Sequence, residues 1–362
     1  MGDAGTERFR DPELMRRLAE HLHRVVGRRD LAFMHVCGTH ENAIARHGLR
    51  SLLPDGLRVI AGPGCPVCVC PPAEIDLAVR LALEHGVIVT TYGDMLNVPT
   101  GRQSLAEARA NGGDVRVVYG AADAVELARA TPRRQVALLA VGFETTACIT
   151  AAVALADPPD NFSMVVSHRL IPPAMEALLE VEGLRIDGFV LPGHVMAVTG
   201  YREYEPIAAR SGPMVVTGFE PVDIMLGLVQ LAELAVAADP RVANAYPRVV
   251  RREGNTRALA AMESAFDVSD ARWRGLGSIG ASGLTLRPQH HRLDATRRFG
   301  LEPDPSLPEG LPGCACGQVM LGMLEPEQCG HFGQACTPDT PWGPCMVSFE
   351  GTCRNRYLYQ GA

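Results

Sequence analysis

Eleven cysteines are the residues of this 362-residue chain best suited to metal binding and redox chemistry. Four lie within residues 37–70 and six within residues 314–353, while Cys148 stands alone. Thiolates are soft ligands for transition metals, and a pair of thiols can exchange electrons by forming a disulfide. In a reducing compartment so many cysteines favour metal binding or redox chemistry over a structural disulfide framework.

The C-terminal cysteines lie in a Gly- and Pro-rich segment, separated by 1, 12, 6, 8 and 7 residues: Cys314, Cys316, Cys329, Cys336, Cys345 and Cys353. Structural zinc sites usually use paired C-x2-C knuckles, and none occurs here. Widely spaced thiolates favour a [4Fe–4S] cluster, with a zinc site of cysteines and His331 as the alternative. Four ligands would leave two thiols for a redox pair, and the spacing leaves open which two.

A second group, Cys65-Pro66-Val67-Cys68 followed by Cys70, lies between a predicted strand and a predicted helix. A helix N-terminus lowers the pKa of a thiol there, which suits redox exchange or binding of a soft metal. A thioredoxin-like active site would have the same local pattern.

Cys37 also follows a predicted strand, and His40 comes one helical turn later. The two could act as nucleophile and base, although a lone cysteine can also be an inert buried residue. Glu144 and His194 follow other strands and are candidates of the same kind. Since open α/β sheets place their sites at the carboxyl ends of strands, Cys37, Cys65 and Cys68 are expected to share one crevice.

Continuous apolar runs alternate with helical stretches up to about residue 240, which is typical of parallel βαβ units. The expected strands are residues 31–36, 57–62, 87–93, 115–120, 135–142, 162–168, 187–193 and 213–218. A strand, a glycine and a polar helix start occur near both residue 37 and residue 142, which suggests two similar halves. We expect an α/β fold of two similar parallel-sheet domains, 1–132 and 133–242, and a small C-terminal iron–sulfur region, 243–362. An eight-stranded barrel is the alternative.

Further along, a helix is expected from Asn255 to Phe266, followed by a Gly-rich stretch and a Pro-rich linker from Glu302 to Pro312. The density of Gly and Pro around the last cysteines predicts loops held by metal rather than by an apolar core.

All 34 basic residues are arginine, so the chain has no lysine. This excludes P-loop nucleotide hydrolysis, Schiff-base catalysis and kinase-type transfer, each of which needs a lysine amine. The net charge of −7 and the absence of a long basic run argue against nucleic acid as a partner. Without a signal-like N-terminus or a long apolar segment, we expect a cytoplasmic protein with no membrane association.

Several longer motifs resemble one family, the HypD maturation proteins of [NiFe] hydrogenases. They are CGTHE, GPGCPVCV, YGDMLNVP, GFETTA, LPGHV, REGN and the cysteine-rich tail, and they span nearly the whole chain. The resemblance implies a scaffold that works in a stable complex with HypC and on which the Fe(CN)2CO unit is built. Cyanide would come transiently from a thiocyanate on HypE, prepared from carbamoyl phosphate by HypF, and the hydrogenase large subunit would be reached indirectly.

The resemblance also assigns roles to residues. It implies that Cys37, Cys65 and Cys68 form the iron-holding and redox group, with His194 and Glu144 handling protons or orienting ligands. The implied [4Fe–4S] ligands are Cys314, Cys329, Cys336 and Cys353. The implied redox pair is Cys316 and Cys345. Cys70 and Cys148 stand where the family usually has other residues.

These expectations describe a redox-active assembly scaffold rather than a conventional turnover enzyme. One alternative is an iron–sulfur thiol–disulfide reductase that acts on a client protein and needs only Cys65 and Cys68. Another is a zinc-stabilised binding protein without redox chemistry.

Overall fold

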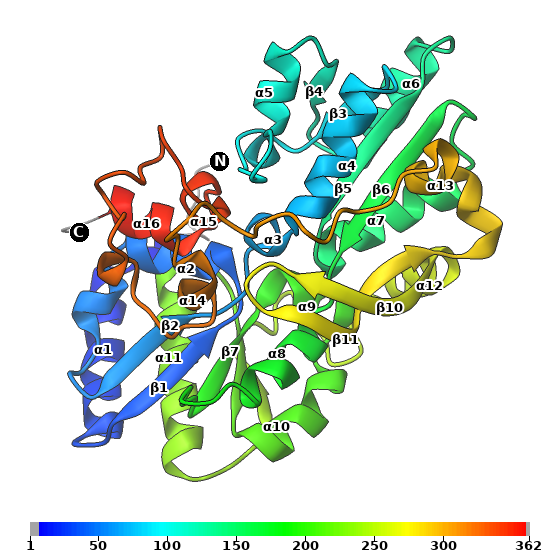
Figure 1. Ribbon diagram of the computed structural model, residues 1–362. Helices are drawn as coiled ribbons and strands as arrows, with labels where there is room; N and C mark the ends of the chain where they lie inside the picture. Colours follow the sequence, from blue (N-terminus) through cyan, green and yellow to red (C-terminus); the bar gives the residue numbers. More distant parts are fainter. Residues whose placement is uncertain (1–6, 360–362) are drawn as a thin grey trace.

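The computed structural model describes residues 7–359, which form two parallel β-sheets flanked by helices and one antiparallel hairpin (Figure 1). The strands are β1 (Leu31–His35), β2 (Leu57–Ala61), β3 (Ile88–Thr91), β4 (Val115–Val117), β5 (Val136–Gly142), β6 (Phe162–His168), β7 (Gly188–Pro192), β8 (Met214–Thr217), β9 (Val242–Asn244), β10 (Phe266–Trp273) and β11 (Gly277–Leu286).

The α-helices are α1 (Pro12–Val26), α2 (Gly38–Arg46), α3 (Pro66–Val69), α4 (Pro72–Leu83), α5 (Leu105–Ala110), α6 (Ala121–Ala130), α7 (Glu144–Leu155), α8 (Ile171–Leu179), α9 (Gly193–Thr199), α10 (Glu205–Ser211), α11 (Pro221–Val236), α12 (Thr256–Ala265), α13 (Ala295–Phe299), α14 (Cys316–Met320), α15 (Pro344–Val347) and α16 (Thr352–Leu358). Within residues 7–359, no helix has both the length and the apolar character needed to cross a bilayer.

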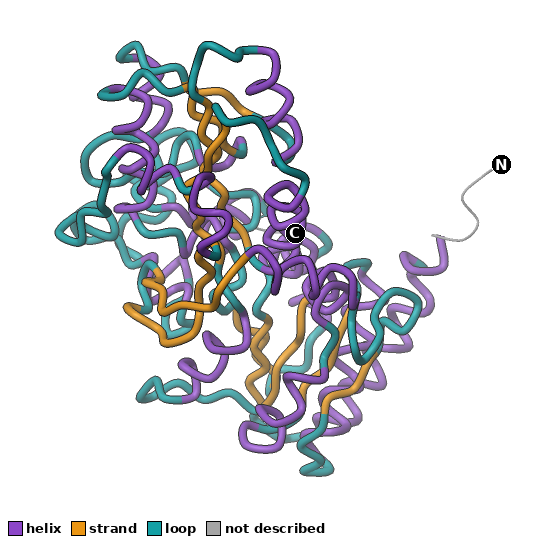
Figure 2. The backbone as a smooth tube through the Cα atoms, turned by 90° about the vertical axis from the view of Figure 1, so that its right-hand side faces the viewer, coloured by secondary structure: helices purple, strands orange, loops and turns teal. Residues whose placement is uncertain are grey.

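The sheets confirm the predicted α/β class and all eight predicted strands. Sheet A has the order β2-β1-β7-β8-β9 and sheet B the order β4-β3-β5-β6, with parallel neighbours throughout. Their central strands are buried along their whole length, as expected for runs covered by helices on both faces. Because the strands lie in two open sheets, the alternative of an eight-stranded barrel is wrong. Figure 2 shows the two groups of strands from the side.

The sequence suggested that the strands divide between two sheets at residue 132, but the structure divides them differently. After β1 and β2 the chain leaves sheet A, builds all four strands of sheet B, and returns to place β7 beside β1. Phe33 is in register with Gly188 across that insertion. The repeated motif does mark equivalent places, because β1 and β5 are both interior strands followed by a helix.

The region after residue 242 contains a hairpin that the sequence did not predict. The expected helix is confirmed as α12, but the Gly-rich stretch after it forms β11, paired with β10 through Phe266 and Leu286. The tip of the hairpin carries the fully buried Trp273 and Arg274.

The C-terminal cysteine region packs on the rest of the molecule, which corrects the expectation of loops held by metal alone. Helix α15 contacts α3, and α16 contacts α2 at the end of sheet A (Figure 1). Cys316 and Cys345 belong to the same buried core as residues of both sheets. Short helices are possible there because Pro344 begins α15 and apolar side chains such as Met346 and Val347 are buried.

Candidate functional site

Cys37, Cys65 and Cys68, here called the N-terminal thiol centre, lie at the carboxyl edge of sheet A. Strands β1 and β2 are parallel neighbours, Cys37 precedes α2, and Cys65 precedes α3. The two junctions touch, since the Gly38 N–H donates to the Gly64 carbonyl at 2.9 Å. A Cβ on Gly64 would lie 2.0 Å from the backbone nitrogen of Cys37, so this approach requires glycine.

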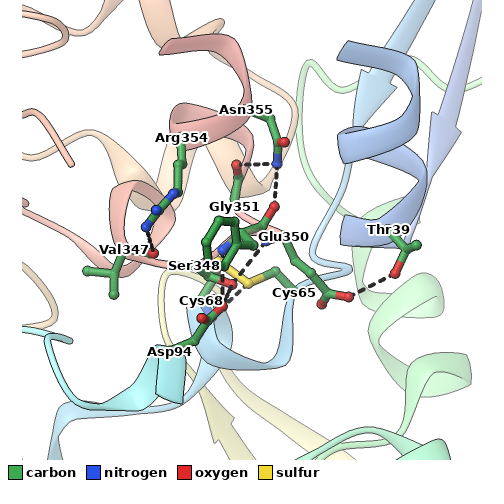
Figure 3. The surroundings of a disulfide bond; sticks show 11 residues. Thr39, Cys65, Cys68, Asp94, Val347, Ser348, Glu350, Gly351, Arg354 and Asn355 are labelled. Carbon is green, nitrogen blue, oxygen red and sulfur yellow. Dashed lines mark hydrogen bonds between the residues drawn. A yellow bond between two sulfur atoms is a disulfide. The ribbon is translucent and has the colours of Figure 1, made fainter. Parts of the chain in front are cut away.

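Cys65 and Cys68 form a disulfide across the single turn of α3, with their Cα atoms 5.2 Å apart (Figure 3). Both side chains are buried. In this oxidised state the pair cannot supply two thiolate ligands, so binding a metal here requires its reduction by two electrons.

The Cys37 thiol is buried at the start of α2. Burial, together with the nearby Glu350 carboxylate, raises the pKa of Cys37 to about 12, although the backbone N–H groups of His40 and Thr39 favour the thiolate. Cys37 is therefore a neutral thiol at physiological pH when no metal is bound. A soft cation would have to displace its proton.

Two carboxylates beside this centre were not recognised as site residues from the sequence. Glu350 accepts a hydrogen bond from Thr39 Oγ1 at 2.8 Å, and Asp94 Oδ2 accepts from Ser348 Oγ at 2.9 Å and from Phe349 N at 3.0 Å (Figure 3). Burial raises the pKa of Glu350, Thr39 opposes that rise, and Asp94 adds to it. Glu350 is 311 residues from Thr39 in sequence, and its only signal was its position in the tail motif.

His40 and His194, both predicted site residues, stack on the same aromatic side chain, Phe219. Their ring centroids lie 4.7 and 3.9 Å from that of Phe219. His40 is fully buried, and its Nε2 lies 2.9 Å from the Gly218 carbonyl and 2.8 Å from Thr217 Oγ1. Burial, together with His35, lowers the pKa of His40 to about 3. Its imidazole is thus neutral and bound to sheet A, while exposed His194 offers the accessible ring.

The hydrogen bond of Glu144 is made to α8 rather than to either group of cysteines. Its Oε1 accepts a hydrogen bond from the Ile171 N–H at 2.9 Å, which caps the start of α8. Burial raises the pKa of Glu144 to about 7, against the effect of that hydrogen bond. Within residues 7–359 no hydrogen bond or ion pair connects it to a cysteine, so the structure provides a helix-capping role.

The six C-terminal cysteines, here called the C-terminal thiol centre, all line one predominantly apolar cavity. Their neighbours in its wall include Val319, Phe332 and Met346. The cysteines come from α14, α15, α16 and the loops between them. Convergence of thiols that are up to 39 positions apart agrees with the idea that they serve one group.

Four of these thiols act on one another's pKa: Cys314, Cys316, Cys345 and Cys353. The neighbouring Cys316 thiol lowers the pKa of Cys314 to about 7, and the Cys316 and Cys353 thiols lower the pKa of Cys345. The pKa values of Cys316 and Cys353 are raised by their thiol neighbours and by burial. Cys316 and Cys345, the expected redox pair, line the same cavity.

The donor set and the cavity wall fit an iron–sulfur cluster. Thiolates are the usual ligands of such clusters, and the Trp342 N–H lies 3.4 Å from Cys336 Sγ, as in the N–H···S bonds that tune them. A Cβ on Gly343 would lie 2.8 Å from Cys314 Sγ, so a glycine keeps room beside the thiols.

No three His, Cys, Asp or Glu side chains within residues 7–359 have the geometry of a single-ion site. His331, the extra ligand of the zinc alternative, stacks on Trp342 with ring centroids 4.0 Å apart.

Residues 344–355 join the two thiol centres. They carry Cys345 and Cys353 of the C-terminal centre, and Glu350 next to Cys37 of the N-terminal centre. The segment is compact, because a Cβ on Gly351 would lie 2.1 Å from the Cys345 carbonyl oxygen.

Within residues 7–359, neither Cys70 nor Cys148 is hydrogen-bonded to a cysteine of either thiol centre. Cys70 is buried with its Sγ 3.3 Å from Ser167 Oγ, and burial, together with Glu74, raises its pKa to about 12. Cys148 donates to the Thr145 carbonyl within α7. Both behave as packed thiols of low reactivity.

Comparison with known proteins gives a consistent result over the whole chain. The profile of the HypD family, described as "Hydrogenase formation hypA family", matches residues 13–360. The hydrogenase maturation factor HypD of Cupriavidus necator is 44% identical over 367 residues, covering 98% of this chain and 96% of that protein. HypD of Escherichia coli is 41% identical over 365 residues, covering 98% and 97%, and HypD of Rhodobacter capsulatus is 40% identical over 367 residues, covering 98% and 97%.

Proposed function

Since this chain belongs to the HypD family of hydrogenase maturation factors, we propose that it is a redox-active scaffold on which the Fe(CN)2CO unit of [NiFe] hydrogenase is assembled. The main support for the proposal is that one chain segment connects the two thiol centres. Three cysteines meet at the edge of sheet A, six line a cavity, and residues 344–355 contribute to both.

The N-terminal thiol centre holds the iron that is the cargo of the reaction. Cys37 and the reduced forms of Cys65 and Cys68 provide three thiolates, which suit low-spin iron with CO and cyanide ligands. When iron binds, the proton of Cys37 leaves, and the Glu350 carboxylate is an adjacent acceptor whose raised pKa favours protonation.

A different pair of cysteines supplies the electrons for cyanide transfer, since Cys65 and Cys68 must stay thiolates to hold the iron. Cleaving the S–CN bond of a thiocyanate to a thiolate and cyanide consumes two electrons. Oxidation of a Cys316 and Cys345 dithiol to its disulfide releases two electrons, so the step balances without another reductant. The Cys65–Cys68 disulfide has to be reduced before each round of iron binding.

The C-terminal thiol centre reduces that disulfide again. Cys314, Cys329, Cys336 and Cys353 would hold a [4Fe–4S] cluster, which supplies one-electron redox chemistry when bound. The apolar wall excludes water from the thiols, and α15 places Cys345 on the helix that packs against α3. Cys316 and Cys345 remain as the dithiol between the cluster and that helix.

The partners are those that the resemblance to the HypD family implies. HypC forms the stable complex, HypE delivers cyanide transiently as a thiocyanate, and the hydrogenase large subunit receives the iron unit indirectly. The chain has no lysine to contact nucleotide phosphates, which fits a protein that leaves ATP-dependent chemistry to its partners.

The Cys65–Cys68 disulfide also favours a second candidate, an iron–sulfur thiol–disulfide reductase acting on a client protein. Such a reductase does not use Cys37. A wild-type protein that reduces a client without ever carrying cyanide-ligated iron, together with a Cys37→Ala protein that reduces it at the same rate, would support the reductase and contradict the scaffold.

The scaffold is tested by infrared spectroscopy of the anaerobically purified complex with HypC, produced together with HypE and HypF. Cyanide and CO stretches are expected in the wild type and in Cys148→Ala, a matched control that removes a thiol outside both centres. They should be absent from Cys37→Ala. Stretches that persist in Cys37→Ala, or are absent from the wild type, would contradict the proposal.

A further inference from the structure

Arg274 is a buried positive charge between the two thiol centres. It lies at the tip of the β10–β11 hairpin and is 1% exposed. Its backbone N–H donates to the Val69 carbonyl of α3 at 2.8 Å, and its Nη1 donates to the Pro99 carbonyl at 3.3 Å. The next residue, Gly275, has a φ of +82°, and a Cβ there would lie 2.7 Å from the Cα of Gly317 in α14. The hairpin tip is therefore fixed between the helices of the two centres.

The guanidinium of Arg274 has donors that no described residue satisfies. Its Nε and Nη2 are buried without a hydrogen-bond partner, and no carboxylate within residues 7–359 forms an ion pair with it. An arginine keeps its proton even when buried, and an uncompensated buried charge costs several kcal/mol. Such an arrangement indicates a negative group that completes the site.

The surroundings of Arg274 indicate where that group belongs. Arg274 lines a second cavity, distinct from the one lined by all six cysteines, together with Cys314 and Cys316. Cys70, Cys316, Glu309 and Cys314 act electrostatically on its charge. The Cys70 thiol is already engaged elsewhere, with its Sγ 3.3 Å from Ser167 Oγ. Negative charge close to the guanidinium can therefore come from the C-terminal thiol centre.

Glu309 is the nearest candidate for a counter-ion within the protein, and its oxygens are already used. Its Oε1 accepts from Arg272 at 3.0 Å and its Oε2 accepts from the Gly275 N–H at 2.7 Å. It is also partly exposed, so solvent screens its charge. Glu309 thus holds the hairpin turn in place and leaves the Nε and Nη2 donors of Arg274 unpaired.

We propose that Arg274 is the counter-charge of the loaded C-terminal thiol centre and raises the reduction potential of its cluster. This inference rests on the cluster of the proposed function. A [4Fe–4S] cluster with four thiolates gains one further negative charge when it is reduced. A fixed positive charge in a site of low dielectric stabilises the reduced state more than the oxidised state, and so favours electron uptake beside α3.

The test is the midpoint potential of the full chain after anaerobic reconstitution with iron and sulfide, read from the EPR signal of the reduced cluster. Arg274→Gln should lower the potential, and Arg274→Lys, which keeps the charge, should restore most of it. Arg287→Gln is the matched control, because it removes the same charge from a partly exposed residue at the far end of the hairpin. It should leave the potential unchanged.

Glu309→Gln gives an independent test if Arg274→Gln does not fold. It removes a negative charge near the guanidinium from a residue that is partly exposed, and a glutamine oxygen can still accept from Gly275. The potential should rise. Unchanged potentials in both Arg274→Gln and Glu309→Gln would overturn the role of Arg274 and leave the scaffold standing. A wild-type protein that takes up no iron and sulfide would instead overturn the cluster of the proposed function.

Discussion

The two thiol centres are held by different means. At the N-terminal centre, Cys37 and Cys65 follow adjacent parallel strands, and Gly64 fixes the contact between the two junctions. At the C-terminal centre, six cysteines converge from helices of at most seven residues and from loops. The sheet therefore places the first set of thiols whether or not a metal is bound, whereas the second set depends more on what the thiols themselves bind.

The largest expected effect follows from loading the C-terminal centre. Reconstitution with iron and sulfide should slow hydrogen exchange in residues 314–359 by roughly a thousandfold, which corresponds to about 4 kcal/mol of local stabilisation. Exchange in β1 and β2 should not change. Hydrogen exchange by mass spectrometry on the loaded and metal-free proteins measures both. Equally slow exchange of residues 314–359 in the metal-free protein would remove the distinction between the centres.

The next largest effects are expected from two glycine substitutions, one at each thiol centre, which should affect different properties of the protein. Gly64→Ala puts a Cβ 2.0 Å from the Cys37 backbone nitrogen, and we expect a loss of about 3 kcal/mol in the global free energy of unfolding. Gly343→Ala meets the Cys314 thiol at 2.8 Å and should mainly reduce the iron content after reconstitution. Urea unfolding and iron analysis of both variants provide the readouts. A Gly343→Ala protein as unstable as Gly64→Ala would show that both centres are equally built into the core.

Lowering the pH should reduce the stability of the folded protein through His40, which lies beside the N-terminal thiol centre. Its pKa is about 3 in the folded protein against an ordinary value of 6.5, so between those values the unfolded chain binds a proton that the folded chain excludes. The contribution of His40 to stability is complete above pH 6.5 and is lost as the pH falls toward 3, by at most about 1.4 kcal/mol per pH unit.

The glutamine in His40→Gln keeps an N–H donor for the Gly218 carbonyl and cannot be protonated. The variant's stability should therefore depend less on pH than that of the wild type, by up to about 1.4 kcal/mol per pH unit. Urea unfolding at pH 7, 6 and 5 measures it. His331→Gln, which removes a histidine stacked on Trp342, is the control. An unchanged slope in His40→Gln would contradict the neutral, buried imidazole.

The smallest expected effect concerns the carboxylate beside Cys37. Glu350→Gln removes a charge that raises the pKa of Cys37, so its alkylation by iodoacetamide at pH 8 should become about three- to tenfold faster. Mass spectrometry of the Cys37 peptide gives the rate. Thr39→Val, which removes the hydrogen bond to Glu350 and keeps the carboxylate, should not accelerate alkylation. A rate in Glu350→Gln no higher than that of the wild type would contradict the assigned coupling.

The strands and the N-terminal centre could be predicted because their causes are local. Runs such as residues 136–142 are apolar throughout, and the edge rule for parallel sheets is enough to predict that Cys37 and Cys65 lie close together. The pairing of β1 with β7 could not be predicted in this way, because nothing in the local pattern shows that sheet B is inserted between them.

The positions of Glu350, Asp94 and Arg274 depend on contacts between distant segments. Ser348 and Asp94 are 254 residues apart, and the hairpin that carries Arg274 has short apolar runs broken by glycine and exposed polar residues. Periodicity does not identify such a strand, and spacing carries no information about what its tip will contact. The tail motif did identify the C-terminal cysteines, but not the core on which they pack.

Mössbauer spectroscopy of the iron-57 complex with HypC tests the central claim, two separate iron-holding thiol centres, most directly. The wild type should show a low-spin Fe(II) doublet and a separate [4Fe–4S] signal. Cys37→Ala should lose only the low-spin doublet, and Cys353→Ala should lose the cluster signal. A Cys37→Ala protein that loses both signals while remaining folded, or a wild type with a single iron environment, would contradict two independent centres.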